Sequence, residues 1–572
     1  MSAAAPPPSR RDALRALLGA PAVAAAMSAG GCGARGRPPL PDGALVGGAE
    51  RLGHRVRDQG APPVPPADRW SRVGVVIAGG GVAGLAAAWR LARAGMRDFA
   101  VLELDAAAGG TAQSGRSPVT AYPWGAHYIV APLAHERALI ALLREMGAIE
   151  GEDRDGHPVV AEELRCREPE ERIYQHGRWY EGLYLSAGET AEDRAERAAF
   201  QREIDRWVGW RDGRGRRAFA LPVSAGSDDA EVTALDRMTM AEWMDRRGLR
   251  SARLRWLIDY ACRDDYGMRP AETSAWAGLL YFASRVRAPG ADSQSVVTWP
   301  EGNGRLVAQL ARAAEGRVRL GVAVCDVVPR GAGAVGAGGA AGARGAGGAG
   351  GADVVAIDGS GQPFGVHADQ VIFAAPQMIA RRVVRPLRDR EPSHSSEFEY
   401  GAWMVANLHL EGRLREPDGG YPLAWDNVFY RSPSLGYVVA THQSGSDHGD
   451  TVLTYYYPLA DQAPAAARRH LLGASRDDWA EVILTDLGRA HRDVRERVRR
   501  LDVMRWGHAM VRPRPGFAWG GARQAAARPI GSIHFAHSDL SGVALFEEAL
   551  DQGVRAAEEV LAARGIASES LR

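Results

Sequence analysis

A glycine-rich turn between two hydrophobic runs constrains this chain more than any other feature. Residues 75–77 form an apolar run typical of a buried strand, residues 85–92 show a helical apolar face, and residues 99–104 form a second strand. Gly79 permits a tight turn between strand and helix, and Gly84 lets the helix pack close to the strand. The pattern therefore predicts a β-α-β unit.

The same turn is suited to a dinucleotide. Gly81 lets backbone amides approach a pyrophosphate, and Val82 and Ala83 begin the helix whose N-terminus faces that group. Glu103 closes the second strand, where its carboxylate can accept both hydroxyls of an adenosine ribose and would repel a 2′-phosphate. We therefore expect FAD or NAD rather than NADP. The alternative is a glycine-rich turn without a nucleotide.

Composition limits the classes of function. The 572 residues exceed one ordinary domain, and a formal net charge of +1 gives no support for nucleic-acid binding. The sequence contains no lysine, so all 70 basic side chains are arginines and a Schiff-base mechanism is excluded. The four cysteines stand far apart without a CxxC pair, which argues against a metal site or a disulfide framework.

Residues 1–32 resemble a twin-arginine export signal. Arg10 and Arg11 precede an apolar stretch over residues 13–26, and small residues lead to Cys32, a candidate site for a lipid anchor. A disordered alanine- and proline-rich tail is the alternative. We expect a periplasmic or otherwise extracytoplasmic protein, exported by the twin-arginine machinery and lipid-tethered if Cys32 is acylated.

The rest of the chain mixes linkers, helices and strands. Residues 33–67 are rich in proline, glycine and arginine and predict a disordered linker. Residues 331–352 are glycine and alanine apart from two residues, and predict a disordered hairpin tip between strands at 317–328 and 354–357. Amphipathic helices are expected at 133–146, 191–210, 240–260 and 476–500, and strands at 370–374, 404–410, 436–441 and 451–457.

Four further segments resemble, in order, the flavin-containing amine oxidase superfamily, which includes protoporphyrinogen oxidases and carotenoid desaturases. In AAAGGTAQSG, Gly109 and Gly110 match the paired glycines after the family's ribose-binding glutamate, and Thr111 follows them where most members have arginine nearby. In YPWGAHYI, Gly125 and His127 lie in a loop that borders the flavin ring in that family.

The other two segments lie further along the chain. TWPEGNGRL resembles the family's glycine turn and helix, and Val324 in the strand that follows falls where a backbone contact to adenine is usual. Near the C-terminus, Asp539 takes the place of the family acid near the flavin phosphates, and the amides that begin the next helix would offset its charge. Leu545 stands at a position where the family has an aromatic residue.

The resemblance implies an α/β fold with FAD as cofactor and no metal. A Rossmann-like FAD/NAD(P)-binding domain is expected from residues 68–135, 295–385 and 501–565, and a mixed α+β substrate domain from 136–294 and 386–500.

The resemblance also implies hydride transfer from an amine or C–C bond of a small substrate to flavin N5, with oxygen or a quinone as electron acceptor. Two alternatives stay open: an FAD-dependent desaturase or isomerase of lipid- or polyene-like substrates, and a non-catalytic binding protein on the same fold. No catalytic residue is identified; the candidates are His127, Trp506 and His508. We interpret Asp264 and Asp265 in the first place as part of a turn at a domain interface, and in the second place as a substrate contact.

Overall fold

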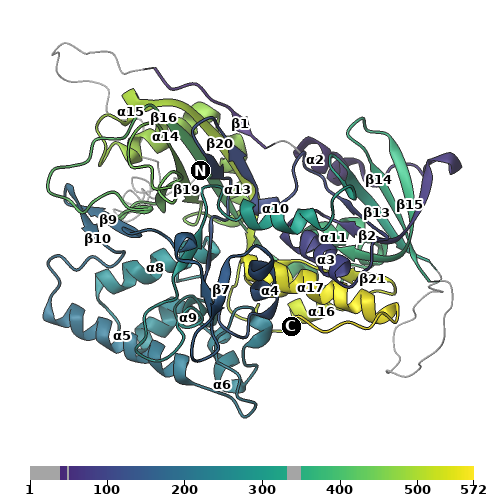
Figure 1. The fold of residues 1–572 in the computed structure, drawn as a ribbon, viewed down its shortest axis with the longest axis horizontal. Helices are drawn as coiled ribbons and strands as arrows, with labels where there is room; N and C mark the ends of the chain where they lie inside the picture. Colours follow the sequence, from purple (N-terminus) through teal and green to yellow (C-terminus); the bar gives the residue numbers. More distant parts are fainter. Residues whose placement is uncertain (1–38, 48–49, 331–349) are drawn as a thin grey trace, which may run out of the picture. The chain divides into compact units, whose positions relative to one another are not determined.

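The computed structural model describes residues 39–47, 50–330 and 350–572. The expected export signal, with Arg10, Arg11 and Cys32, and most of the glycine-alanine segment lie outside these residues. Within the described part, two large sheets organise the chain (Figure 1). The α/β fold class predicted from the sequence is confirmed.

The first sheet has seven strands and contains the glycine-rich turn. Its path runs β12-β3-β2-β15-β14-β13, with β21 added beside β15. The pairs that join β12, β3, β2, β15 and β21 are parallel, whereas β13, β14 and β15 form an antiparallel meander. The strands are β2 (Trp70–Ala78), β3 (Phe99–Leu102), β12 (Val318–Arg319), β13 (Ala323–Pro329), β14 (Ala352–Ile357), β15 (Pro363–Phe373) and β21 (Ile533–Phe535).

Two helices pack together beside this sheet. α3 (Val82–Arg93) follows the glycine turn, and α17 (Phe546–Ala563) lies along it (Figure 1). Gly553 permits their close approach, because a Cβ atom there would stand 2.2 Å from the carbonyl oxygen of Ala83. α4 (Arg137–Glu145) and α10 (Gly304–Arg312) share a hydrophobic core with α3 and α17.

The second sheet has eight strands in the order β1-β20-β16-β19-β18-β17-β9-β10. Tyrosine, tryptophan and β-branched side chains fill the cores on its two faces, as expected of strands. The strands are β1 (Leu45–Val46), β9 (Glu171–Gln175), β10 (Arg178–Glu181), β16 (Tyr400–Leu410), β17 (Asp426–Phe429), β18 (Gly436–Val439), β19 (Thr451–Pro458) and β20 (Val498–Val511).

The remaining elements are helices around the two sheets and three short hairpins or strand pairs. α5, α7, α8 and α9 share a core of their own, in which α5, α7 and α9 each bury a tryptophan. The helices are α2 (Glu50–Gln59), α5 (Ala191–Gly209), α6 (Ala230–Thr233), α7 (Met240–Arg246), α8 (Ala252–Tyr266), α9 (Ala275–Ala283), α11 (Gln377–Val383), α12 (Arg385–Asp389), α13 (Pro464–Gly473), α14 (Arg476–Leu487), α15 (Val494–Arg497) and α16 (Ala522–Ala526). The pairs are β4 (Ser114–Arg116) with β5 (Ala121–Pro123), β6 (Tyr128–Val130) with β11 (Val296–Thr298), and β7 (Ile149–Glu152) with β8 (Pro158–Val160).

Three sequence expectations are wrong. The linker at 33–67 is ordered in its described part, because β1 pairs with β20 and α2 buries apolar side chains. The helix at 240–260 is two helices, since Gly248 turns the chain with a φ of 69° after α7. The helix at 476–500 ends at Leu487, and β20 already begins at Val498.

One expected domain boundary also moves. The boundary at residue 501 falls inside β20, which is a continuous strand of the eight-stranded sheet. Residues 501–511 therefore belong with that sheet, because their backbone pairs with β16. The rest of the division into domains stays a prediction.

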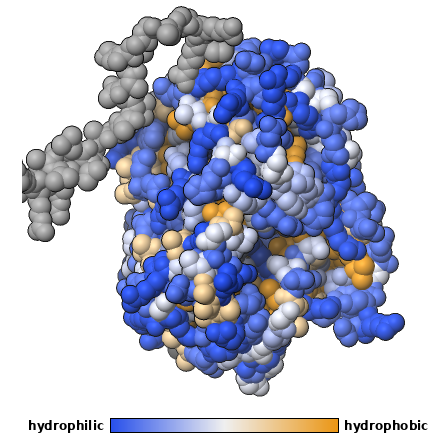
Figure 2. Space-filling model, turned by 90° about the vertical axis from the view of Figure 1, so that its left-hand side faces the viewer, coloured by the Kyte–Doolittle hydropathy of each residue, from blue (hydrophilic) through white to orange (hydrophobic). Residues whose placement is uncertain are grey.

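Among the described residues, no helix is both long and apolar enough to span a bilayer. The face drawn in Figure 2 is mainly hydrophilic, with smaller hydrophobic areas and a hollow near its centre.

Candidate functional site

The glycine-rich turn has the geometry that a tight strand-to-helix connection needs. Gly79 adopts a φ of 111°, a conformation that other residues rarely take. A Cβ atom on Gly84 would stand 1.9 Å from the carbonyl oxygen of Gly79, so only glycine fits between β2 and α3.

The space beside the turn is open where a pyrophosphate is expected. A Cβ atom on Gly81 would find its nearest neighbour, the Cα atom of Gly110, at 4.0 Å. Gly109 donates its amide to the Gly80 carbonyl at 2.8 Å and so holds the second glycine pair beside the first. No side chain of the described residues caps α3. The uncapped N-terminal amides, including those of Val82 and Ala83, can bind an anion.

Glu103 lies at the end of β3 beside this turn. Its carboxylate accepts the amides of Gly80 at 2.5 Å and Asp105 at 2.7 Å. Burial raises the pKa of Glu103, and these two hydrogen bonds oppose the shift. The Glu103 carbonyl accepts the Val322 amide at 2.8 Å, which brings β13 and Val324 to the same end of the site. The residues therefore fit the adenosine half of FAD.

Asp539 is buried against a different helix from the one expected. Its Oδ2 atom accepts hydrogen bonds from the Tyr400 hydroxyl at 2.5 Å and from the Gln377 amide, at the start of α11, at 2.9 Å. The sequence interpretation placed the start of α17 beside this charge. Burial would raise the pKa of Asp539, but His537 and these hydrogen bonds outweigh it and lower that pKa.

The two glycine loops expected at the flavin are in contact. The Ala126 amide donates to the Thr111 carbonyl at 2.9 Å, and a Cβ atom on Gly125 would stand 2.1 Å from the same oxygen. Trp506 on β20 donates its indole N–H to the Trp124 carbonyl at 2.6 Å. Thr111, Gly125 and Trp506 are therefore brought together from three parts of the chain.

His127 connects these loops to a group of tyrosines. Its ring stacks on Tyr456 at a centroid distance of 4.5 Å, and the Tyr456 hydroxyl donates to the Gly125 carbonyl at 2.9 Å. Burial lowers the pKa of His127 to about 4. The imidazole is therefore neutral at neutral pH.

Beyond His127 lie three carboxyl groups from distant segments: Glu171 on β9, Asp264 on α8 and Asp426 on β17. Each retains exposed surface, yet burial is the largest cause of its raised pKa, which for Glu171 reaches about 7. All three side chains are therefore only partly accessible to water. Asp264 also raises the pKa of Glu171, and both of these acids raise the pKa of Asp426, which places the three carboxyls within electrostatic range.

Tyrosines contact two of these carboxyls. Tyr128 donates to Asp264 Oδ2 at 3.3 Å, and Tyr260 donates to Asp426 Oδ2 at 3.0 Å. Asp265, the neighbour of Asp264, points elsewhere: both of its oxygens lie 2.7 Å from the Arg285 guanidinium. We call the following set the acidic chamber: Tyr128, Glu171, Tyr260, Asp264, Tyr281, Asp426 and Tyr456.

The structure separates other expected site residues. His508 is exposed on β20 with its ring 5.9 Å from that of Tyr400, beside Asp539 rather than the acidic chamber. Partial desolvation of the ring, together with the nearby Arg468, lowers its pKa to about 4. Leu545 precedes α17 and packs on the helical core of α5 and α7 to α9.

Sequence reasoning missed Glu171 and Asp426. Both follow irregular segments and begin strands, and no local spacing links them to Asp264. The signal that could have found them is weak: each acid stands at the first position of a short strand, followed by one polar and then two apolar residues. Asp264 was noted in the sequence, but the expected turn is wrong, because Asp264 and Asp265 lie inside the helix α8. A substrate contact at Asp264 stays a prediction.

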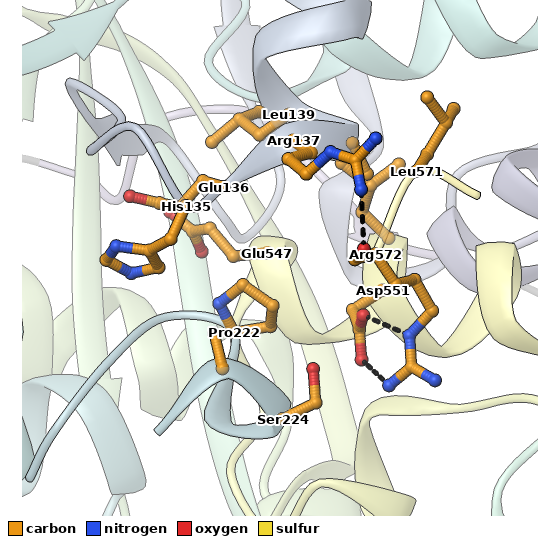
Figure 3. Close-up of a pocket in the computed structure, with 13 residues that line it drawn as sticks. His135, Glu136, Arg137, Leu139, Pro222, Ser224, Glu547, Asp551, Leu571 and Arg572 are labelled. Carbon is orange, nitrogen blue, oxygen red and sulfur yellow. Dashed lines mark hydrogen bonds and ion pairs between the residues drawn. The ribbon is translucent and has the colours of Figure 1, made fainter. Parts of the chain in front are cut away.

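A separate pocket of about 260 Å³ lies between α4, α17 and residues 222–225 (Figure 3). Glu136 and Glu547 line it, and burial raises the pKa of both. At its rim Arg572 holds Asp551 through two hydrogen bonds of 2.7 and 2.9 Å. The expected dinucleotide residues do not line this pocket, so it is not the cofactor site.

Comparison with known proteins identifies the family. The family described as flavin containing amine oxidoreductase matches residues 82–561, which is most of the chain. The chain belongs to this family. It is also 24% identical over 220 residues to oxidoreductase PigB of Serratia sp. (strain ATCC 39006); the match covers 36% of this chain and about a third, 31%, of that protein.

Solved structures support the fold. Putrescine oxidase bound to putrescine is similar with a TM-score of 0.61 and 18% identity, over 86% of this chain and 100% of the other. Cyclohexylamine oxidase from Brevibacterium oxydans IH-35A gives a TM-score of 0.57 and 15% identity, over 86% and 99%. The flavin-containing family and the cradle around Gly81 agree, and the protein is an FAD-dependent oxidoreductase.

Proposed function

We propose that this protein oxidises a small amine that enters the acidic chamber as a cation. The observation that carries the proposal is the meeting of Glu171, Asp264 and Asp426 with tyrosine rings next to His127. Carboxylates and aromatic faces together favour an ammonium group. A chamber for a hydrocarbon chain would gain nothing from three desolvated acids, since buried charges are costly without a partner.

The raised pKa values suit a second task. A carboxyl whose pKa is near neutrality can take a proton from a bound ammonium better than an ordinary aspartate can. Asp264, whose pKa is raised by burial and by Asp265, is the candidate for this proton transfer. Tyr128 orients its carboxylate through the hydrogen bond to Oδ2. Bound FAD would supply the two-electron acceptor: once Asp264 has taken a proton from the ammonium group, hydride from the C–H bond next to nitrogen passes to the flavin and the substrate becomes an imine.

The contacts around the chamber support placing it at the flavin end. They run from Gly81 and Gly110 through Thr111 and Gly125 to His127. The fold of this chain also occurs in proteins named as oxidases of putrescine and cyclohexylamine, which are both amines.

Anaerobic reduction by a substrate panel tests the proposal. The oxidised protein is mixed with small mono- and diamines and, separately, with polyenes and unsaturated fatty acids, and the flavin absorbance is followed. We expect at least one amine to bleach it. Bleaching only by a lipid-like compound would overturn the proposal in favour of a desaturase or isomerase.

We also propose export through the twin-arginine pathway, on the basis of Arg10 and Arg11 before the apolar stretch. Replacing both with lysine should retain the protein in the cytoplasm while leaving its FAD content unchanged. Export at the original level, measured by cell fractionation, would contradict this part of the proposal.

A further inference from the structure

The N-terminal segment before the glycine turn is joined to the eight-stranded sheet. β1 pairs in parallel with β20, with Leu45 opposite Val503. The Ala44 amide donates to Asp502 Oδ1 at 2.8 Å, and the Leu501 amide donates to the Asp42 carbonyl at 2.7 Å. These contacts hold residues 42–46 on one sheet.

α2, the next element, packs on the other sheet. Leu52 and Val56 share an apolar cluster with Leu104 and with two residues of β13, Ala323 and Cys325. Leu104 directly follows the expected ribose ligand Glu103, and the two β13 residues flank Val324. Figure 1 shows α2 beside β13 and β14. The apolar side of α2 therefore lies at the adenosine end of the FAD site.

The other side of α2 carries two groups that act electrostatically on β20. His54 and Arg57 are within electrostatic range of His508 and help to lower its pKa. The His508 ring contacts Tyr400 edge to face, and Tyr400 donates to Asp539. α2 is thus close both to the Glu103 end and to the Asp539 end.

We propose that β1 and α2 form a clasp that closes the FAD site, with Leu52 and Val56 as the wall over its adenosine half. The matched family begins at residue 82, so the clasp is built from residues outside that match. The clasp is joined to both sheets and should therefore slow FAD release. Before FAD leaves, either α2 must separate from β13 or β1 must separate from β20.

The test compares the same substitution, valine to alanine, at position 56 on α2 and at the exposed position 64. V56A and the double variant L52A/V56A weaken the clasp, and V64A removes the same methyl groups from a nearby side chain that is 79% exposed. FAD release from the diluted holoprotein is measured by the rise in flavin fluorescence. We expect the double variant to release FAD about tenfold faster than wild type, V56A to be intermediate and V64A to be unchanged. Equal rates in V56A, L52A/V56A and V64A would overturn the clasp.

Limited trypsin digestion gives a second measurement that does not depend on activity. Arg55 and Arg57 on α2 are exposed sites, and Arg154, in the hairpin of β7 and β8, is an exposed control. Bound FAD should slow cleavage after Arg55 and Arg57 several-fold relative to apoprotein while leaving cleavage after Arg154 unchanged. Equal cleavage of α2 with and without FAD would contradict the proposal.

Discussion

Asp264 and Asp265 are neighbours on α8, yet their side chains meet different surroundings. Asp265 is neutralised by Arg285 in a two-oxygen ion pair, which suits a structural role. Asp264 accepts from the Tyr128 hydroxyl and lies in electrostatic range of the other chamber acids. At the scale of single residues, the difference between these two carboxyls decides which one can hold a cation.

Replacing Asp264 with asparagine should weaken amine binding. An asparagine keeps an oxygen for Tyr128 but removes the negative charge, so we expect the Kd of an amine substrate to rise about 10- to 100-fold. Saturation of the flavin reduction rate in anaerobic stopped-flow experiments gives this Kd. D155N, on an exposed hairpin residue, is the control. Equal Kd values in D264N and D155N would refute the assignment.

Glu171 should make stability depend on pH. Burial and Glu170 raise its pKa from 4.5 to about 7, so between these values the folded state holds a proton that the unfolded state releases. The unfolding free energy therefore falls as pH rises through this window. E171Q lacks this contribution and should gain about 1–2 kcal/mol over wild type between about pH 5 and pH 8. Denaturant unfolding measures it; a difference that does not vary with pH would be inconsistent with a buried, protonated Glu171.

At the scale of secondary-structure elements, the contact between α3 and α17 positions the start of α3 for the dinucleotide. Gly553 is the point of closest approach, with 2.2 Å between a would-be Cβ atom and the Ala83 carbonyl. Gly473, which ends α13, has no atom within 4 Å of its would-be Cβ and an ordinary backbone. The two glycines therefore offer a matched pair of substitutions.

G553A should lower the unfolding free energy by about 1–3 kcal/mol, because the added methyl group forces α17 away from α3. FAD content after purification should fall with it, since the amides at the start of α3 shift. G473A should be neutral or slightly stabilising. Thermal unfolding and flavin absorbance give both quantities. A G553A protein as stable as G473A would show that the helices can separate at no cost.

Elements with strong local signals could be predicted from the sequence, and those set by distant contacts could not. The turn at Gly79 and the strands and helix around it follow from residues within 30 positions of each other. α2 escaped prediction because its amphipathic face is short and finds its partner, β13, about 270 residues later. The break at Gly248 was missed since the hydrophobic pattern continues across it.

At the scale of the whole molecule, the cofactor cradle and the acidic chamber differ in how they are encoded. The cradle is mostly local, so Gly81 and Glu103 could be assigned from spacing alone. The chamber depends on distant segments: β9 pairs with β17, which places Asp426 opposite Glu171, and α8 supplies Asp264. That pairing brings two like charges together, which sequence reasoning gave no cause to expect.

The pH dependence of amine binding tests most directly whether the acidic chamber holds a cation. The Kd of one amine substrate is measured by anaerobic flavin reduction from about pH 6 to pH 8, where the amine stays protonated. Ionisation of the chamber carboxyls should lower the Kd as pH rises through about 7, the pKa of Glu171. A Kd that stays constant or increases over this range would contradict cation binding by these acids.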